Sequence, residues 1–202
     1  MNLWNLRAPL YNFFRKPWPL NIILGKETRN IRELLAGVHL YDGKVLDVGC
    51  GVGHSSHLLP GAWQVFAMDK SRRMAARAAR AGTKNIAAAE ADFLPVADNS
   101  FDVILAIGLT EYLASLPKFF AETKRSGKNN SLLLCTSSPP GIFSLLRNLG
   151  GSKIYQRAPK KIIQTAANAG LALLAQRHFF SQDAFLFQIL KENPFLGAKS
   201  DS

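Results

Sequence analysis

Residues 45–53, which read VLDVGCGVG, limit the fold of this chain more than any other stretch. A short apolar run typical of a buried strand leads directly into three glycines at alternate positions. Because glycine adopts backbone angles that are closed to other residues, this spacing predicts a tight turn from a strand into a helix. Such a turn brings the backbone close to a ligand, whose space a side chain at any of these glycines would occupy. A tight turn without a ligand is the alternative.

The glycine spacing separates this turn from two common nucleotide-binding turns. It reads G-x-G-x-G, whereas the dinucleotide-binding fingerprint reads G-x-G-x-x-G. A phosphate-binding loop ends in Gly-Lys followed by Ser or Thr, and this stretch has no such ending. Both alternatives therefore fit the sequence poorly.

Strand-like and helix-like segments alternate along the rest of the chain. Strand patterns cover residues 45–48, 64–68, 85–89, 101–109, 131–136, 171–178 and 184–190. Helix patterns cover residues 27–36, 54–59, 71–81, 117–124 and 160–169. The alternation predicts an α/β fold with a mostly parallel sheet of seven strands. The last two strands have no helix between them, which predicts an antiparallel hairpin at the edge.

The length of 202 residues suits one domain, and 48% apolar residues with 19% charged ones are typical of a globular chain. We expect the domain at residues 41–193, an N-terminal segment at residues 1–40 and a flexible tail at residues 194–202. Two cysteines inside apolar runs, with no metal-ligand spacing, favour a reducing compartment. No signal peptide or long apolar run is visible, so a soluble, cytoplasmic protein is expected.

The net charge of +11 is distributed unevenly. Residues 1–40 carry six basic and two acidic side chains, residues 41–117 carry seven and eight, and residues 118–202 carry twelve and four. An excess of basic residues indicates an anionic partner, which nucleic acid, an acidic membrane surface or a phosphorylated substrate would each satisfy. The middle third is not basic, so the excess belongs to the two flanks.

Asp69 ends the second predicted strand, twenty-two residues after Asp47. In an open α/β sheet, a carboxylate at this position can accept hydrogen bonds from both hydroxyls of a ribose. The alternative role is to cap the helix that begins at Ser71. One side chain can serve both purposes.

These residues together resemble the class I S-adenosylmethionine-dependent methyltransferases, in the broad group that includes methyltransferase type 11 and the ubiquinone and menaquinone biosynthesis enzymes. The resemblance covers about residues 44–138 and implies a Rossmann-like three-layer sandwich that binds S-adenosylmethionine. In such enzymes the glycine turn lies against the methionine part of the cofactor, and the acid after the second strand holds the ribose. The residues that the resemblance assigns to these two roles are Asp47, Gly49, Cys50, Gly51, Gly53 and Asp69.

A second block, EADFLPVADNSFDVILA at residues 90–106, resembles the family's D-A-x-x-L-P-F segment and the Phe-Asp that follows it. Glu90 stands where the family usually has Asp to bind the adenine amino group, and the backbone N–H of Ala91 would meet the adenine ring. Asp92 competes with Glu90 for this role, and an exposed loop acid is the alternative for either. Lys70 and Met74 would also lie near the adenine, although Met74 fits a core position equally well.

The fourth predicted strand ends at the place where open α/β sheets bind ligands. The resemblance puts Ile107 beside the transferred methyl group and puts Glu111 and Tyr112 near the substrate, with a solvent-facing helical turn as their alternative. Methyl transfer from a sulfonium mainly requires alignment, so a general base is optional. The candidate bases are Glu111, Tyr112 and His54, with His57 close by.

The flanks favour a small-molecule or lipid-like acceptor that carries a negative group. Residues 1–25 combine aromatic and basic side chains, which suit either a lid over the substrate or peripheral contact with an anionic membrane. Residues 139–161 mix apolar and basic side chains where the family often places a substrate cover. The fourth strand ends in Ile-Gly-Leu-Thr without the Asp/Asn-Pro-Pro-aromatic motif, which disfavours nucleic acid. A catalytically silent, partner-binding subunit with the same fold is the alternative function.

Overall fold

The structure is a computed structural model, and it describes Gly25 and residues 28–29, 31–35, 42–58, 62–138, 153–179 and 182–191. The expected segment before residue 25, most of the expected substrate cover and the tail after residue 191 lie outside the described residues. Among the described residues, no helix is long and apolar enough to cross a membrane. The same part of the chain contains no group of three or more side chains that could hold a metal ion.

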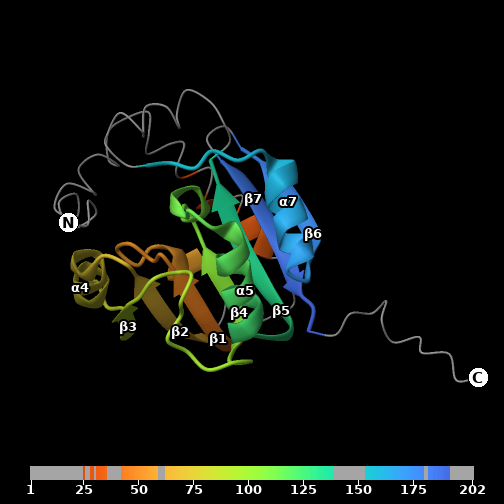
Figure 1. The fold of residues 1–202 in the computed structure, drawn as a ribbon. Helices are drawn as coiled ribbons and strands as arrows, with labels where there is room; N and C mark the ends of the chain where they lie inside the picture. The colour runs from red at the N-terminus through yellow and green to blue at the C-terminus, as the bar shows by residue number, and fades with distance from the viewer. Residues whose placement is uncertain are drawn as a thin grey trace, which may run out of the picture.

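One sheet of seven strands, counted over the described residues, organises the molecule (Figure 1). The strands are β1 (Asp42–Val48), β2 (Ala62–Asp69), β3 (Asn85–Ala88), β4 (Phe101–Ala106), β5 (Gly127–Ser137), β6 (Leu171–His178) and β7 (Asp183–Ile189). Their order in the sheet is β3-β2-β1-β4-β5-β7-β6. Strands β1 to β5 pair in parallel, and β7 runs antiparallel to both β5 and β6. The predicted α/β fold and its antiparallel hairpin are therefore confirmed.

Helices cover both faces of the sheet because the central strands are apolar on both sides. On β4, Ile104 and Ala106 belong to the core cluster beneath α5 (Leu116–Ser126) and α7 (Pro159–Asn168). Val103 and Leu105 belong to the opposite cluster, which the helical residues 31–35 cover. Each fully buried side chain of this size contributes roughly 1.5–3 kcal/mol to folding. The two apolar faces together produce the three layers.

Helix α4 (Arg72–Arg80) lies over β2 near the β3 edge of the sheet (Figure 1). Its Ala78 packs against Ala67 of β2. Ala67 points to the side opposite Met68, because successive side chains of a strand alternate. Met68 belongs to the cluster beneath α5 and α7, so α4 covers the other face.

Several predicted elements differ from those observed in their bounds, and two of the differences have a clear local cause. The fourth strand ends at Ala106 instead of residue 109 because Gly108 has a φ of 65° and turns the chain into the 3-10 helix η3 (Thr110–Tyr112). The predicted helix at residues 54–59 is the 3-10 helix η2 (Ser55–Leu58), and Pro60 follows it in the sequence. The fifth strand begins at Gly127 instead of residue 131, and Asn130 inside it has a φ of 62°, an angle that asparagine tolerates.

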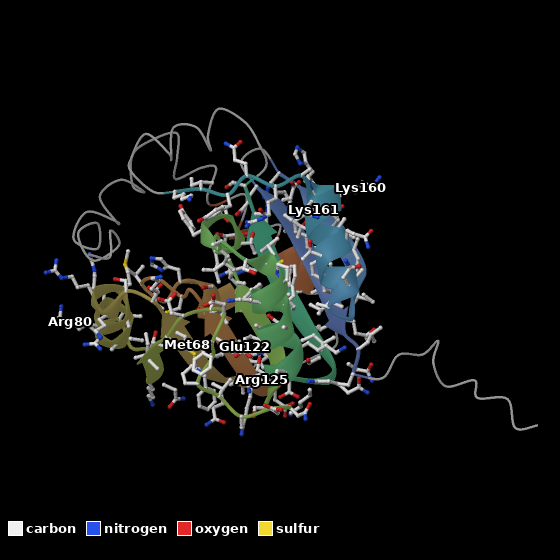
Figure 2. All side chains as sticks on the ribbon, viewed as in Figure 1. Met68, Arg80, Glu122, Arg125, Lys160 and Lys161 are labelled. Carbon is white, nitrogen blue, oxygen red and sulfur yellow. The ribbon has the colours of Figure 1, made fainter. Side chains whose placement is uncertain are left out.

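Arg125 of α5 anchors the loop between β3 and β4. Its guanidinium binds both carboxylate oxygens of Glu122 at 2.9 Å, and it also binds Asp98 at 2.7 Å. It donates further hydrogen bonds to the carbonyl oxygens of Leu94 and Val96, and the Glu122 carboxylate accepts one from the Leu94 N–H. The bond from Arg125 lowers the pKa of Glu122. Figure 2 shows the two side chains close together at the lower end of α5. The loop that carries the second sequence block is therefore fixed to a core helix.

Candidate functional site

The glycine turn begins where β1 ends, at the carboxyl edge of the sheet. Gly49, Gly51 and Gly53 have φ values of 71°, 58° and 86°, in the left-handed region that favours glycine. The N–H groups of Gly49 and Cys50 both donate to the carbonyl oxygen of Met68, at 2.7 and 3.0 Å. These bonds close the turn against the end of β2.

Packing inside the protein explains two of these glycines. A Cβ at Gly49 would lie 2.8 Å from Cδ1 of Leu109, and a Cβ at Gly53 would lie 2.8 Å from Oγ1 of Thr83. A side chain at Gly49 or Gly53 would therefore meet protein atoms, and the expectation that it would enter ligand space stays a prediction. Glycine is favoured at these two positions because the turn packs against Leu109, which follows β4, and against Thr83, which follows α4.

Asp47 supports the turn from inside the protein. Its side chain belongs to a residue that is 1% exposed, and both carboxylate oxygens accept hydrogen bonds from the Ser55 hydroxyl, at 3.0 and 2.8 Å. Burial raises the pKa of Asp47 to about 7, against the lowering effect of the Ser55 hydrogen bond and with a further increase from the Asp69 charge. Asp47 thus joins the two ends of the turn and lies beneath the open surface.

Asp69 connects the glycine turn to the start of α4. Its Oδ2 accepts a hydrogen bond from the Gly51 N–H at 2.9 Å, and its Oδ1 accepts one from the Ser71 N–H at 2.7 Å. Burial raises the pKa of Asp69, while these two bonds lower it. The cap of α4 is Ser71, whose hydroxyl accepts a bond from the Met74 N–H at 3.2 Å. Because a carboxylate has about four acceptor positions, Asp69 keeps capacity for two ligand hydroxyls.

An open hollow of about 380 Å³ lies beside the ends of β2 and β3. Its lining combines alanines and a proline with an aromatic ring and charged side chains: Lys70, Arg72, Ala88, Ala89, Glu90, Phe93 and Pro95. Lys70 and Glu90 form an ion pair at 2.8 Å. Phe93 is 79% exposed and contributes its aromatic ring to this lining.

The structure groups only some of the predicted adenine contacts. Lys70 and Glu90 both line the hollow, whereas Asp92 is exposed and lies outside its lining. Ala91 is 8% exposed, and Met74 is 2% exposed in the interior, which matches the core alternative. Sequence reasoning missed Phe93, although it stands inside the quoted block.

Hydrogen bonds tie the end of β4 to β5. The Gly108 N–H donates to the Thr136 hydroxyl at 2.7 Å, and the Thr110 hydroxyl donates to the Thr136 carbonyl at 2.8 Å. Glu111 is 1% exposed and accepts a bond from the Ser138 hydroxyl at 3.2 Å. Its burial contradicts the solvent-facing alternative.

The remaining candidates near this edge are at least partly accessible. Ile107, which leaves β4, and Tyr112, which ends η3, are both half-buried. His54 is exposed directly after the glycine turn. The side chain of His57 lies outside the described residues.

Residues 153–157 run beside η3 and hold it in place. The Arg157 guanidinium donates to the carbonyl oxygens of Thr110 at 3.0 Å and Leu113 at 2.6 Å, and the Tyr155 N–H donates to the Glu111 carbonyl at 2.7 Å. The Tyr155 ring lies 5.2 Å from the Lys153 ammonium and 5.3 Å from the Arg157 guanidinium. Burial lowers the pKa of Arg157. The cationic side chains of Lys153 and Arg157 therefore lie near η3, which follows β4.

Comparison with known proteins identifies similar sequences and similar folds. Residues 46–135 match the family model described as a methyltransferase domain. Over 110 residues the chain is 32% identical to malonyl-[acyl-carrier protein] O-methyltransferase of Xylella fastidiosa (strain M23), a match covering 51% of this chain and 37% of that relative. The corresponding protein of Geobacter sulfurreducens is 27% identical, with 46% of its length covered. The chain thus matches less than half the length of either relative.

Solved structures share the fold at low sequence identity. A chain in the complex between the Haloferax volcanii Trm112 methyltransferase activator and a methyltransferase has a TM-score of 0.76 and 15% identity, covering 94% of this chain and 99% of that one. Magnesium protoporphyrin IX methyltransferase from Synechocystis PCC 6803, solved with bound SAH, has a TM-score of 0.67 and 15% identity, with 85% and 87% covered. These similarities show the fold alone.

Proposed function

We propose, from the premise that residues 46–135 form a class I methyltransferase domain, that this chain transfers a methyl group from S-adenosylmethionine to a small-molecule or lipid-like acceptor. The bond of 2.9 Å between the Gly51 N–H and the Asp69 carboxylate carries the proposal. It joins the glycine turn and the acid after β2 into one rigid unit at the carboxyl edge of the sheet. Open α/β sheets bind their ligands at this edge.

The chemistry of the unit fits this cofactor. Asp69 has acceptor positions for the ribose hydroxyls, and the neighbouring hollow offers Phe93 and an apolar floor to a flat ring. We place the adenine amino group at Glu90 in preference to Asp92, since only Glu90 lines the hollow. When bound, S-adenosylmethionine would supply a methyl group already activated on sulfur. The task of the protein is then to hold donor and acceptor in line.

Titration calorimetry with S-adenosylmethionine and its demethylated product tests the proposal. Replacing Asp69 with alanine is expected to weaken binding by about 1–3 kcal/mol, or about 5- to 150-fold, because charged hydrogen bonds are lost. Asp92→Ala is the matched control, since it removes an exposed acid outside the hollow. Thermal melting of both variants excludes unfolding as the cause. If neither ligand binds at millimolar concentration, the silent, partner-binding subunit becomes the better account.

An acceptor with a carboxylate suits the surroundings of η3. A group that is ionised at neutral pH needs no general base, and Glu111 is buried against Ser138. The Lys153 ammonium beside Tyr155 lies where an anionic acceptor would be attracted. The relatives named above methylate a malonyl group on an acyl carrier protein, and we propose a carrier-linked carboxylic acid here. Mass spectrometry of malonyl-acyl carrier protein after incubation is expected to show one added methyl group, and an unchanged mass would contradict this acceptor.

Delivery of the acceptor from a membrane is a separate proposal, supported by the basic and aromatic composition of residues 1–25. Sedimentation with anionic vesicles is expected to fall when residues 1–20 are removed. Equal sedimentation of the full and shortened chains would rule out contact through this segment. A cytoplasmic location stays a prediction from the cysteine content.

A further inference from the structure

Helix α4 presents a row of arginines on its outer face. It contains Arg72, Arg73, Arg77 and Arg80 and no acidic residue. At 3.6 residues per turn, the four side chains fall within an arc of about 140°. The buried side chains Met74, Ala75 and Ala78 occupy the opposite arc. Figure 2 shows Arg80 pointing away from the sheet.

Three of the four arginines on this face carry charges that the described part of the chain does not neutralise. Within it, Arg72, Arg77, Arg80 and the nearby Lys84 form no ion pair. Residues 70–84 contain six basic residues and no acid, although the middle third of the chain is near neutral. The compensating acids follow later in the sequence, at Glu90, Asp92, Asp98 and Asp102. Three of these acids are paired with bases outside α4, Glu90 with Lys70, Asp98 with Arg125 and Asp102 with Lys128, so the near-neutral sum conceals the positive face of α4.

Helix stability accounts for only part of these charges: Arg77 and Arg80 stand in the last turn of α4, where the helix dipole favours cations. Arg72 and Arg73 stand in the first turn of α4, where the helix dipole favours anions and disfavours cations. Four like charges on one face also repel one another. The positions of Arg72 and Arg73 and the mutual repulsion of the four arginines thus favour an anionic partner that compensates them.

The shape of the face selects among anionic partners. Between the arginines, the exposed residues are Ala76 and Ala79, so the face has no large apolar side chain to insert into a membrane. Nine residues of helix span only about 13 Å. On the side of the hollow, Lys70 is paired with Glu90 and Asp92 is exposed, so the positive surface ends there. A short positive surface bounded by acids fits the carboxylates of one acidic helix better than a long phosphate backbone.

We propose that the face formed by Arg72, Arg73, Arg77 and Arg80 docks an acidic helix of the protein that carries the methyl acceptor. Guanidinium groups bind carboxylates through two parallel hydrogen bonds, which gives such a contact direction as well as attraction. Arg72 also lines the hollow, so the docked protein lies at the carboxyl edge of the sheet. The identity of the partner as an acyl carrier protein rests on the proposed function, whereas the docking surface itself rests on α4.

Charge reversal on two layers of the molecule tests the surface. The variant Arg77→Glu/Arg80→Glu changes α4 and leaves Arg72 of the hollow intact. The variant Lys160→Glu/Lys161→Glu makes the same change of charge on α7, whose labelled lysines lie far from Arg80 in Figure 2 and are exposed. Fluorescence anisotropy measures the binding of labelled malonyl-acyl carrier protein to the full chain and to both variants. Calorimetry with S-adenosylmethionine confirms that each variant is folded.

The α4 variant is expected to raise the Kd for the carrier protein roughly tenfold or more, while the α7 variant keeps it. The difference is expected to shrink at high salt, which screens exposed charges. Methylation of malonyl-coenzyme A, a free thioester, is expected to be equal in all three proteins. If the unmodified chain does not methylate malonyl-coenzyme A, the proposed acceptor is refuted. The docking proposal is then tested by the anisotropy measurement alone.

Four outcomes overturn the docking proposal. The first is that the unmodified chain does not bind the carrier protein, and the second is that the α4 variant binds it as tightly as the unmodified chain. The third is that the α7 variant loses as much affinity for the carrier protein as the α4 variant. The fourth is that double-stranded RNA or anionic vesicles bind in an α4-dependent way and more tightly than the carrier protein.

Discussion

Replacing Gly49 with alanine is expected to lower the free energy of unfolding by about 2–5 kcal/mol. The left-handed backbone costs a residue with a Cβ about 1–2 kcal/mol, and φ at Gly49 is 71°. The new Cβ would also lie 2.8 Å from Cδ1 of Leu109, and such overpacking costs about 1–3 kcal/mol. Urea denaturation followed by circular dichroism measures the loss.

Gly108→Ala separates the two causes. Gly108 has nearly the same backbone angle, 65°, but a Cβ there meets no atom within 4 Å. We therefore expect only the backbone cost of about 1–2 kcal/mol at this position. Equal losses in the two variants would show that the Leu109 side chain moves aside and that packing does not require glycine at residue 49.

The free energy of unfolding of the unmodified chain is expected to fall between about pH 4 and pH 7 because of Asp47. Changing Asp47 to asparagine is expected to remove this fall. The pKa of this carboxyl is about 7 in the folded chain and near its ordinary value of 3.8 in the unfolded chain. Within that window the folded chain holds a proton that the unfolded chain has lost. The free energy of unfolding therefore falls as pH rises, by up to about 4 kcal/mol in total. The contribution is complete below pH 4 and absent above pH 7.

The asparagine variant retains an acceptor for the Ser55 hydroxyl but carries no titrating group. At pH 8 it is expected to exceed the unmodified chain in stability, and at pH 4 the advantage is expected to disappear. Asp102→Asn is a control of opposite sign. Burial is the largest single influence and raises the pKa of Asp102, but the hydrogen bonds from Lys128 and from the Lys44 N–H, together with the charges of both lysines, lower that pKa overall. Asp102 stabilises the fold at neutral pH and loses that effect as pH falls. Parallel pH profiles of the unmodified chain and Asp47→Asn would show that Asp47 does not titrate in this range.

Local signals in the sequence were sufficient for the sheet. The predicted strand at residues 171–178 is β6, and the glycine turn leaves β1 as expected. Buried strands produce apolar runs, and glycine or asparagine marks the left-handed turns between elements, so both features are written locally. Gly108, with a φ of 65° between β4 and η3, is an instance.

The environment of the site residues required the fold. Nothing in the sequence indicates that Asp47 is buried and hydrogen-bonded to Ser55. This hydrogen bond depends on how tightly the glycine turn closes. The Asp69 bond to Gly51 crosses 18 residues and exists only after β1 and β2 pair. The basic face of α4 disappeared in a charge count taken along the chain. Binding depends on where charges lie in three dimensions, and a sum over 77 positions conceals the positive face of one helix.

The hydrogen bonds from Arg125 to the loop between β3 and β4 order this loop during folding, before any ligand binds. Because a core helix holds Leu94, Val96 and Asp98, the conformational entropy of this loop is lost when the protein folds. A ligand that enters the adjoining hollow meets a wall already in position, and none of its binding energy is consumed in assembling that wall. The affinity of the site is thus coupled to a guanidinium that the ligand never touches.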